Sequence, residues 1–254
     1  MKWNEELEGR LLKLRDEDEL TYKEIAEEFD TTVSSVKHKY IRLKQAANDD
    51  KHHHPVEKTE QVYRVLGEQD PNSPITILET KAGWGNLTQE YRKFGVVLAQ
   101  DIEANKVEHL KQFSSVVAKR CDSFKEMHRQ VYEGMKFDVV DLDPYGFPSR
   151  FFPHVFELIE DGHLFVTFPK MGVQQINKIT KEHYRVFWGM TLADKDRQEE
   201  LIHKKIKDYG FQSFRRVELV DSVDLGRMFR FAYKVNKESA LTLVDLKVKG
   251  KNGK

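Results

Sequence analysis

The sequence predicts an α/β protein in which a mostly parallel sheet follows a small helical unit. From residue 75 onward, apolar β-branched runs of strand length alternate with helix-like segments, as in strands joined by crossover helices. Before residue 46, apolar residues instead recur every three or four positions, as in short helices. At 254 residues the chain is long enough for a complete α/β domain and a small satellite.

Composition sets broad limits on the class of protein. Lys and Arg number 42, as do Asp and Glu, so net charge neither favours nor excludes a polyanionic partner. No apolar stretch approaches the ~20 residues of a membrane helix, and the N-terminus lacks the apolar segment of a signal peptide. We therefore expect a cytoplasmic protein without a membrane partner. The single cysteine, Cys121, excludes an internal disulfide and cannot alone form a thiolate zinc site.

Three short helices are predicted in the first 46 residues. Leucines at helical spacing predict the first helix over residues 5–15, and Thr21 with Glu24 forms a capping-box pattern that opens the second. The third begins after the polar turn 30–32, where apolar residues recur at Val33, Val36 and Tyr40. This order is typical of a helix-turn-helix unit.

A family resemblance supports this interpretation. Trp3, Tyr22 and Tyr40 recur at 19 and 18 residues, and LTYKEIAEEFDTTVSSVKHKYIRL is similar to the second and third helices of Myb-like domains, although tyrosine replaces two of the usual three tryptophans. The resemblance covers residues 2–45 and implies that the third helix enters the DNA major groove. The nucleic-acid-binding face that it implies consists of Thr32, Ser34, Ser35, Lys37, His38, Lys39 and Arg42. The alternative is a solvated face on a protein-interaction module.

These patterns divide the chain into four parts. Residues 1–46 form the helix-turn-helix domain, 47–60 a linker, 61–236 the α/β domain and 237–254 a basic tail. The linker lacks apolar periodicity and contains Pro55. Its consecutive histidines, residues 52–54, cannot share one helix or strand face, and we predict no metal site.

Seven strands are predicted in the α/β domain. They cover residues 75–79, 95–100, 115–119, 137–142, 163–168, 214–220 and 227–235. Helices are expected to begin near Asn86, Ala104, Phe124, Ser149 and Gln174, with another at 196–208. Seven strands ending in a hairpin resemble the Rossmann-like fold of class I S-adenosylmethionine-dependent methyltransferases.

Polar residues at three successive strand ends form the candidate cofactor site. After Glu79, the turn Thr80-Lys81-Ala82-Gly83-Trp84-Gly85 leads into a helix, and such a turn directs free backbone N–H groups at a ligand. The turn resembles methyltransferase motif I, with Lys81 where many relatives have glycine. The resemblance implies that Glu79 lies near the methionyl amino group of S-adenosylmethionine. The predicted cofactor set is Glu79, Lys81, Gly83, Trp84, Gly85, Asp101, Ile102, Asp122, Ser123 and Asp141.

The acids in this set have individual roles. Asp101 ends the second strand, where nucleotide-binding folds place an acid for ribose hydroxyls. Asp122 follows the third strand, where related methyltransferases bind the adenine amino group; it can instead be a helix N-cap. NAD is the competing cofactor, but Thr88 stands where the dinucleotide fingerprint needs its third glycine.

The string DLDPYGFP, residues 141–148, follows the fourth strand. Its DPYG core is similar to the motif of amino-methyltransferases, and the longer string resembles the tRNA guanine-N2 methyltransferases. The resemblance implies that Asp143 and Pro144 orient an exocyclic amine while Tyr145 stacks on the base, and Gly146 completes the predicted catalytic set. Asp141 is expected to support the loop or contact the cofactor.

Function follows from these two modules. The leading interpretation is a DNA amino-methyltransferase held on the duplex by its helix-turn-helix domain. A tRNA guanine-N2 methyltransferase is the alternative, and a DNA-binding regulator with an inactive cofactor domain is a third. Residues 172–194 are a candidate target-recognition insert or an amphipathic helix, since they mix basic and aromatic side chains at Lys178, Lys181, His183, Tyr184, Arg185, Phe187 and Trp188.

Overall fold

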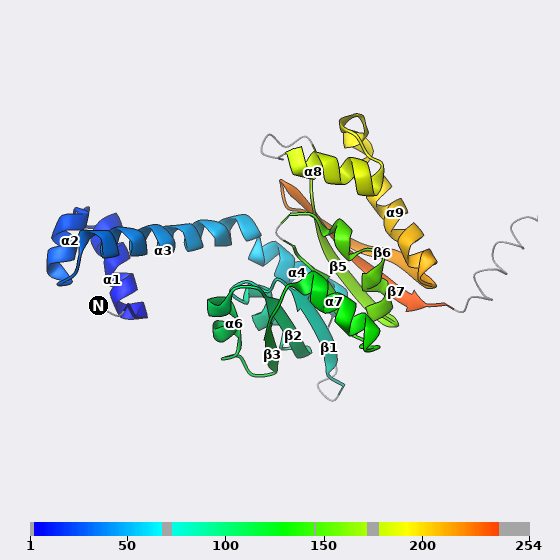
Figure 1. The fold of residues 1–254 in the computed structure, drawn as a ribbon, viewed down its shortest axis with the longest axis horizontal. Coiled ribbons are helices and arrows are strands. Elements are labelled where there is room, and N and C mark those ends of the chain that lie inside the picture. Colours follow the sequence, from blue (N-terminus) through cyan, green and yellow to red (C-terminus); the bar gives the residue numbers. More distant parts are fainter. Residues whose placement is uncertain (1–2, 68–72, 145, 172–177, 239–254) are drawn as a thin grey trace, which may run out of the picture. The chain divides into compact units, whose positions relative to one another are not determined.

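The computed structural model describes residues 3–67, 73–144, 146–171 and 178–238 (Figure 1). The chain divides into two compact units, Met1–Pro55 and Val56–Lys254. Each has its own apolar core. Among the helices in the described ranges, none is long and apolar enough to cross a membrane.

The first unit contains the three predicted helices, α1 (Glu5–Asp16), α2 (Tyr22–Glu28) and α3 (Val33–His53). The predicted capping box is present at the start of α2: the Glu24 N–H donates to the Thr21 hydroxyl, and Glu24 accepts from the Thr21 N–H. The core is formed by Leu11, Ile25, Ala26, Phe29 and Val36. With five such side chains, the unit has a small core that depends on contacts at its rim.

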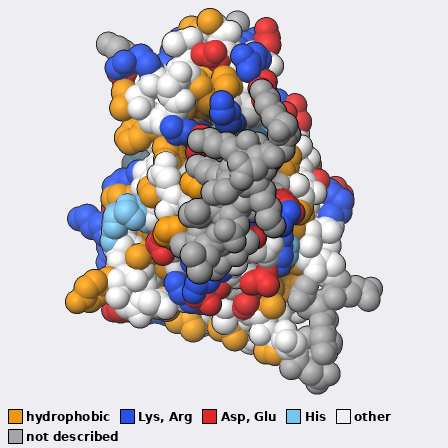
Figure 2. Space-filling model, turned by 90° about the vertical axis from the view of Figure 1, so that its right-hand side faces the viewer, with side chains coloured by type: hydrophobic (Ala, Val, Ile, Leu, Met, Phe, Trp, Pro, Cys, Tyr) orange, Lys and Arg blue, Asp and Glu red, His pale blue; other side chains and the backbone are white. Residues whose placement is uncertain are grey.

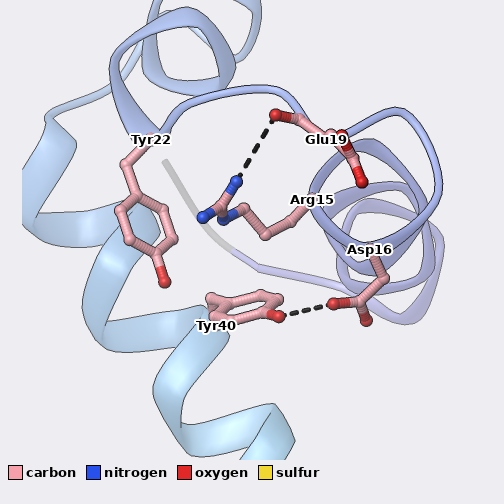
Figure 3. Close-up of a pocket in the computed structure, with 5 residues that line it drawn as sticks. All are labelled: Arg15, Asp16, Glu19, Tyr22 and Tyr40. Carbon is pink, nitrogen blue, oxygen red and sulfur yellow. Dashed lines mark hydrogen bonds between the residues drawn. The ribbon is translucent and has the colours of Figure 1, made fainter.

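One rim contact joins all three helices (Figure 3). The Arg15 guanidinium lies over the Tyr22 ring, 4.9 Å from its centroid, and donates to the Leu20 carbonyl at 2.9 Å. The Tyr40 hydroxyl donates to the Asp16 carboxylate at 2.5 Å. The rings of Tyr22 and Tyr40 also meet edge to face, 5.7 Å apart. The tyrosines that replace tryptophans in the predicted pattern therefore supply hydroxyl or cation contacts as well as apolar area.

The segment predicted as a linker, residues 47–60, is helical. It contains the end of α3 and the first half of α4 (Pro55–Leu66), which the sequence analysis did not predict. His54, between them, has a left-handed backbone with φ of 51°. Pro55 can begin a helix because the first helical residue needs no N–H partner. The buried face of α4 includes polar Lys58 and Gln61 beside Val62 and Leu66, so apolar periodicity could not reveal the helix.

The second unit contains the seven predicted strands in one sheet of order β3-β2-β1-β4-β5-β7-β6, in which β7 runs antiparallel to both neighbours. The strands are β1 (Ile75–Thr80), β2 (Gly95–Asp101), β3 (Val116–Arg120), β4 (Val139–Leu142), β5 (Asp161–Pro169), β6 (Arg215–Asp224) and β7 (Met228–Lys237). The predicted α/β class with a mostly parallel sheet is confirmed.

Helices cover both faces of this sheet. Side chains of α4, α5 (Asn86–Tyr91) and α6 (Ala104–Leu110) pack with Ile77, Val139 and Phe165 in one cluster. Those of α7 (Ser123–Tyr132) and α9 (Gln198–Gln212) pack with Leu78 and Val140 in the other. Because strand side chains alternate, Glu79 and Asp141 point to the same face as Ile77 and Val139, which is the face of α4.

The segment after β4 differs from the prediction. Two 3-10 turns, Pro148–Phe151 and His154–Leu158, stand where a helix was expected from Ser149. Proline at positions 148 and 153 explains the short turns, because it cannot donate within a longer helix. The predicted helix start at Gln174 lies outside the described residues. Beyond that point lie α8 (Lys178–His183), a π-helical turn (Tyr184–Trp188) and a 3-10 turn (Leu192–Arg197).

A buried ion pair connects β4 with β7 across β5. Both Asp141 carboxylate oxygens accept from the Arg230 guanidinium, at 2.6 and 3.1 Å, and neither side chain is exposed. The Tyr91 hydroxyl of α5 donates to the same carboxylate at 2.7 Å, and Arg230 also donates to the Thr167 hydroxyl at 3.2 Å. The pair thus fixes the end of β4 relative to its neighbours.

We predict that Arg230→Met lowers the free energy of unfolding by about 3–5 kcal/mol, because it leaves the Asp141 carboxylate buried without a cation. The double variant Arg230→Met, Asp141→Leu should recover most of this loss, since both charges are then removed. Urea titration of the full chain, followed by circular dichroism, measures both values. A double variant no more stable than the single one would contradict this account.

Candidate functional site

The predicted cofactor and acceptor residues meet at one edge of the sheet. Glu79 pairs in register with Ala99 on one side and with Asp141 on the other, and Asp101 pairs with Arg120. Because β1, β2, β3 and β4 are parallel, their carboxyl ends share an edge, which is where open α/β sheets bind ligands. The strand-end residues singled out by sequence therefore lie in one region.

The turn after β1 has the backbone that its glycines suggest. Lys81, Gly83 and Gly85 all have left-handed backbones, with φ of 53°, 61° and 85°. A side chain at position 85 would lie 2.7 Å from atoms of both Leu110 and Phe113, so glycine is required there for space as well as conformation. Lys81 accepts a conformation that costs a non-glycine residue on the order of 1 kcal/mol.

Asp101 fixes this turn to the end of β2. Its carboxylate accepts from the Gly83 N–H at 3.0 Å and from the Glu103 N–H at 2.9 Å. Two apolar side chains beside it are exposed: Ile102 by 64% and Trp84 by 43%. Exposed apolar surface next to a fixed carboxylate suits a ligand that combines a flat ring with hydroxyl groups.

At the end of β3, Asp122 takes the alternative role considered for it, that of a helix N-cap. Its carboxylate caps α7 by accepting from the N–H groups of Phe124 and Lys125, at 2.9 and 3.4 Å. Ser123 is buried, and its hydroxyl has no hydrogen-bond partner among the described residues. The Gln100 side-chain amide is also buried without a partner there. Buried polar groups of this kind are costly unless a ligand or water satisfies them.

Glu79 is a buried carboxyl group that no cation contacts among the described residues. The Thr88 hydroxyl donates to it at 2.5 Å. Burial raises the pKa of Glu79 from its ordinary 4.5 to about 8; the Thr88 hydrogen bond opposes this rise, and the nearby Asp141 and Asp143 carboxylates add to it. The site thus contains an acid that a cationic ligand would convert to its charged form.

Asp143 forms an ion pair that the sequence analysis missed. Its Oδ2 contacts the Lys58 ammonium group from α4. The Lys58 side chain is 3% exposed and that of Asp143 is 24% exposed. Burial tends to raise the pKa of Asp143, but the positive charges of Lys58 and Arg230 prevail and hold it below its ordinary value. Asp143 is therefore a charged acceptor that remains accessible at the edge of the sheet.

The remaining residues of the predicted catalytic set form the loop after Asp143. Gly146 has φ of 117°, a backbone conformation that residues other than glycine rarely adopt. Pro144 is buried. Tyr145 lies outside the described residues. The Phe147 ring anchors the loop by meeting the Tyr184 ring edge to face at 4.4 Å, and the Ser149 hydroxyl contacts the His183 ring nitrogen at 3.2 Å.

The buried Asp141 side chain supports this loop from the core of the domain. From the sequence, Asp141 is expected either to contact the cofactor or to support the loop. Because both of its oxygens are engaged by Arg230 and Tyr91 in the core, the structure favours support over contact with a cofactor. Three carboxyl groups, those of Glu79, Asp141 and Asp143, thus share this region with two cations, Lys58 and Arg230.

The candidate recognition insert is divided between core and surface. Tyr184 and Trp188 are buried in the apolar core, as in an amphipathic helix. Lys181, Arg185 and Phe187 are exposed, and Arg185 pairs with Glu182. Residues 172–177 and the Lys178 side chain lie outside the described part of the chain.

The side chains of the predicted nucleic-acid face of α3 differ in exposure. Ser34, Lys37, His38 and Arg42 are exposed and follow helical spacing along one face. Lys39 instead pairs with Glu8 of α1 at 2.5 Å and is half-buried. Thr32 is exposed but is also the N-cap of α3, accepting from the N–H of half-buried Ser35 at 3.2 Å.

Charge elsewhere on the surface is mixed. On the face shown in Figure 2, blue Lys and Arg side chains alternate with red Asp and Glu. Within the described ranges, no three His, Cys, Asp or Glu side chains are placed to hold a metal ion. The His52 and His53 side chains are outside those ranges.

Comparisons with known proteins were made for each unit. The family model for Sigma-70, region 4 matches residues 5–46. Among solved structures, Trm1 from Pyrococcus horikoshii, in complex with S-adenosyl-L-methionine, has a TM-score of 0.59 at 15% identity, covering 76% of this chain and 57% of that one. The M. jannaschii tRNA m1G37 methyltransferase has a TM-score of 0.45 at 13% identity, covering 72% and 50%. No curated protein sequence matches the chain.

The second unit has the class I methyltransferase fold. The N-terminal helices are of the helix-turn-helix type, matched by the sigma factor region; the more specific Myb-like resemblance stays a prediction. The chain spans little more than half the length of Trm1, so the likeness covers the fold of one part of that protein.

The raised pKa of Glu79 predicts a pH-dependent cost of folding. Between pH 4.5 and about 8 the folded chain keeps a proton that the unfolded chain has lost, so the contribution of Glu79 to stability falls as pH rises. Glu79→Gln should therefore gain stability over the wild type with rising pH, by at most about 5 kcal/mol above pH 8. Denaturant titrations at pH 5 and pH 8 measure this difference.

Glu108→Gln, on the exposed face of α6, is the control. An advantage of equal size at both pH values would refute the assignment.

Proposed function

We propose that this protein transfers a methyl group from S-adenosylmethionine to an exocyclic amine of a nucleic-acid base. One observation carries the proposal: the ionised, accessible Asp143 carboxylate lies at the same sheet edge as the glycine turn and Glu79. An enzyme that methylates an amine needs an acceptor for its N–H groups beside a cofactor site.

The residues at the sheet edge fit the proposed cofactor. S-adenosylmethionine supplies a methyl group on a positively charged sulfur and also carries an ammonium group. Glu79 is buried with no contacting cation among the described residues, and it would face this positive charge. Asp101 offers carboxylate oxygens for ribose hydroxyls, and exposed Ile102 offers a surface for the adenine ring. The buried hydroxyl of Ser123 would gain a partner.

The acceptor residues fit the chemistry of an exocyclic amine. The nitrogen lone pair of such an amine is delocalised into the base, so the amine must be oriented before it can form a new N–C bond. Asp143 and the backbone carbonyls beside it can accept the N–H bonds, and the negative charge stabilises the nitrogen as it becomes positive. Tyr145 is proposed to stack on the base. A base within a duplex would have to be flipped out to reach this loop.

DNA is the first candidate for the polymer. The helix-turn-helix unit, matched by a sigma factor region, presents Lys37, His38 and Arg42 on the face of α3 that faces solvent. A tRNA is the second candidate, favoured by the resemblance of DLDPYGFP to the tRNA guanine-N2 methyltransferases. We propose that the cofactor domain is active in either case, since Asp143 and Pro144 are retained.

Methyl transfer from labelled S-adenosylmethionine to duplex DNA and to unmodified tRNA tests the proposal. Nucleoside digestion and mass spectrometry should identify one N-methylated base. Calorimetry should show cofactor binding that Asp101→Ala weakens, whereas binding of NAD in its place would refute the cofactor assignment. Methylation on carbon or on a protein would refute the acceptor assignment.

Asp143→Asn should abolish most of the methyl transfer while leaving cofactor affinity nearly unchanged. The neutral amide loses a charge-assisted hydrogen bond worth roughly 2–4 kcal/mol, so turnover should fall by about two to three orders of magnitude. Single-turnover rates and cofactor titration of the same variant separate the two effects, with circular dichroism to check folding. Near-normal turnover would show that the loop is not the acceptor site.

The proposed α3 face predicts how DNA affinity depends on salt. Lys37→Ala and Arg42→Ala should each reduce the slope of log affinity against log salt by about one, because each removes a phosphate contact. Lys39→Ala is a matched control, since Lys39 pairs with Glu8 and should leave the slope nearly unchanged. Filter binding at several salt concentrations measures the slopes. If Lys37→Ala and Arg42→Ala leave the slope as unchanged as Lys39→Ala does, the binding face lies elsewhere.

A further inference from the structure

We infer that Lys58 is a positioning residue for the acceptor site: its ammonium group holds Asp143 as an oriented carboxylate that can receive the amine. The inference rests on the proposed role of Asp143. It assigns a function to a residue outside every motif recognised in the sequence, 85 positions before its partner.

The placement of Lys58 is fixed by its helix. The side chain is 3% exposed, and lysine is almost never buried to this extent unless it is paired. One turn later, Gln61 donates to the Arg230 carbonyl at 3.2 Å, and Val62 and Leu66 pack into the core beside β1. These contacts hold α4 against the sheet and direct the Lys58 ammonium group at Asp143 Oδ2.

Groups on several elements of the described structure act on Asp143. They are Lys58 on α4, Glu79 on β1, the Thr167 hydroxyl on β5 and Arg230 on β7, and Asp141 lies two residues before it on β4. Arg230 is in direct contact with Asp141, whereas the ammonium group in direct contact with Asp143 comes from Lys58. Without Lys58, burial would raise the pKa of Asp143 against a weaker opposition, from the Arg230 charge and the Thr167 hydrogen bond.

Protonation matters because it changes what Asp143 can do. A carboxylate offers about four acceptor positions, so contact with Lys58 at Oδ2 leaves others for the amine. A protonated carboxyl group turns one oxygen into a donor, which competes with the amine N–H. Lys58 therefore widens the pH range over which the acceptor site works, without touching the substrate.

The test is the pH profile of methyl transfer by full-length Lys58→Met and Lys58→Arg. In Lys58→Met the acid limb of kcat/KM should move up by about one to three pH units, the usual effect of losing an adjacent opposite charge. Lys58→Arg keeps the charge and should restore the wild-type limb. Lys111→Met, which removes a surface cation at the C-cap of α6, should not move it. A merely structural role would lower the rate at all pH values and leave the limb in place.

A second measurement needs no activity. Carbon-13 labelling of aspartate carboxyl groups, with Asp143 identified by the signal missing in Asp143→Asn, follows its titration by NMR. The Asp143 midpoint should rise in Lys58→Met, and Lys58→Gln replaces that variant if it fails to fold. An unchanged midpoint and an unchanged acid limb would overturn the inference. Absence of methyl transfer by the wild type would instead count against the proposed function, while the NMR titration would still decide the role of Lys58.

Discussion

The position of the loop after β4 depends on the buried ion pair between Asp141 and Arg230. It joins the end of β4 to β7 two residues before Asp143, and the Tyr91 hydroxyl ties α5 to the same carboxylate. A buried ion pair repays its desolvation poorly as a source of stability. Its value here is in geometry, because a short strand such as β4 has few ladder bonds to fix its last residue. Replacing the pair by apolar groups can preserve the fold and still displace the loop.

The mostly parallel sheet and the approximate strand ends could be predicted from sequence. Strand-length runs that alternate with helix patterns require crossover connections, and parallel strands place their carboxyl ends at one edge. Asp101 was singled out by its place at a strand end, whereas Glu79 and Asp143 were singled out by resemblance to methyltransferase motifs. Two local features could also be predicted from the sequence. The left-handed backbones at Gly83 and Gly85 need glycine, and the capping box at Thr21 begins α2.

The residues that could not be predicted are polar groups on buried faces. Lys58 and Gln61 interrupt the apolar pattern of α4, so the first half of the helix was assigned to a linker, although Val62 and Leu66 pack in the core cluster of the sheet. Arg230 lies 89 positions from Asp141, and no local pattern connects them. The same limit explains Tyr184 and Trp188, whose burial depends on which side of a mixed helix meets the sheet. Residues that become partners only through the tertiary structure cannot be identified from the apolar periodicity of the sequence.

Charge balance relates the stability of this region to its proposed activity. Arg230 compensates Asp141 and Lys58 compensates Asp143. Glu79 accepts from the neutral Thr88 hydroxyl, and burial raises its pKa to about 8. Folding around Glu79 is therefore least favourable when it is charged. Under the proposed function, a cationic cofactor would reverse this cost, because it would bind the charged form and stabilise the folded state. The carboxyl group that weakens the protein by itself is then the one that favours a positively charged ligand over an anionic nucleotide, a trade of stability for selectivity that is common at functional sites.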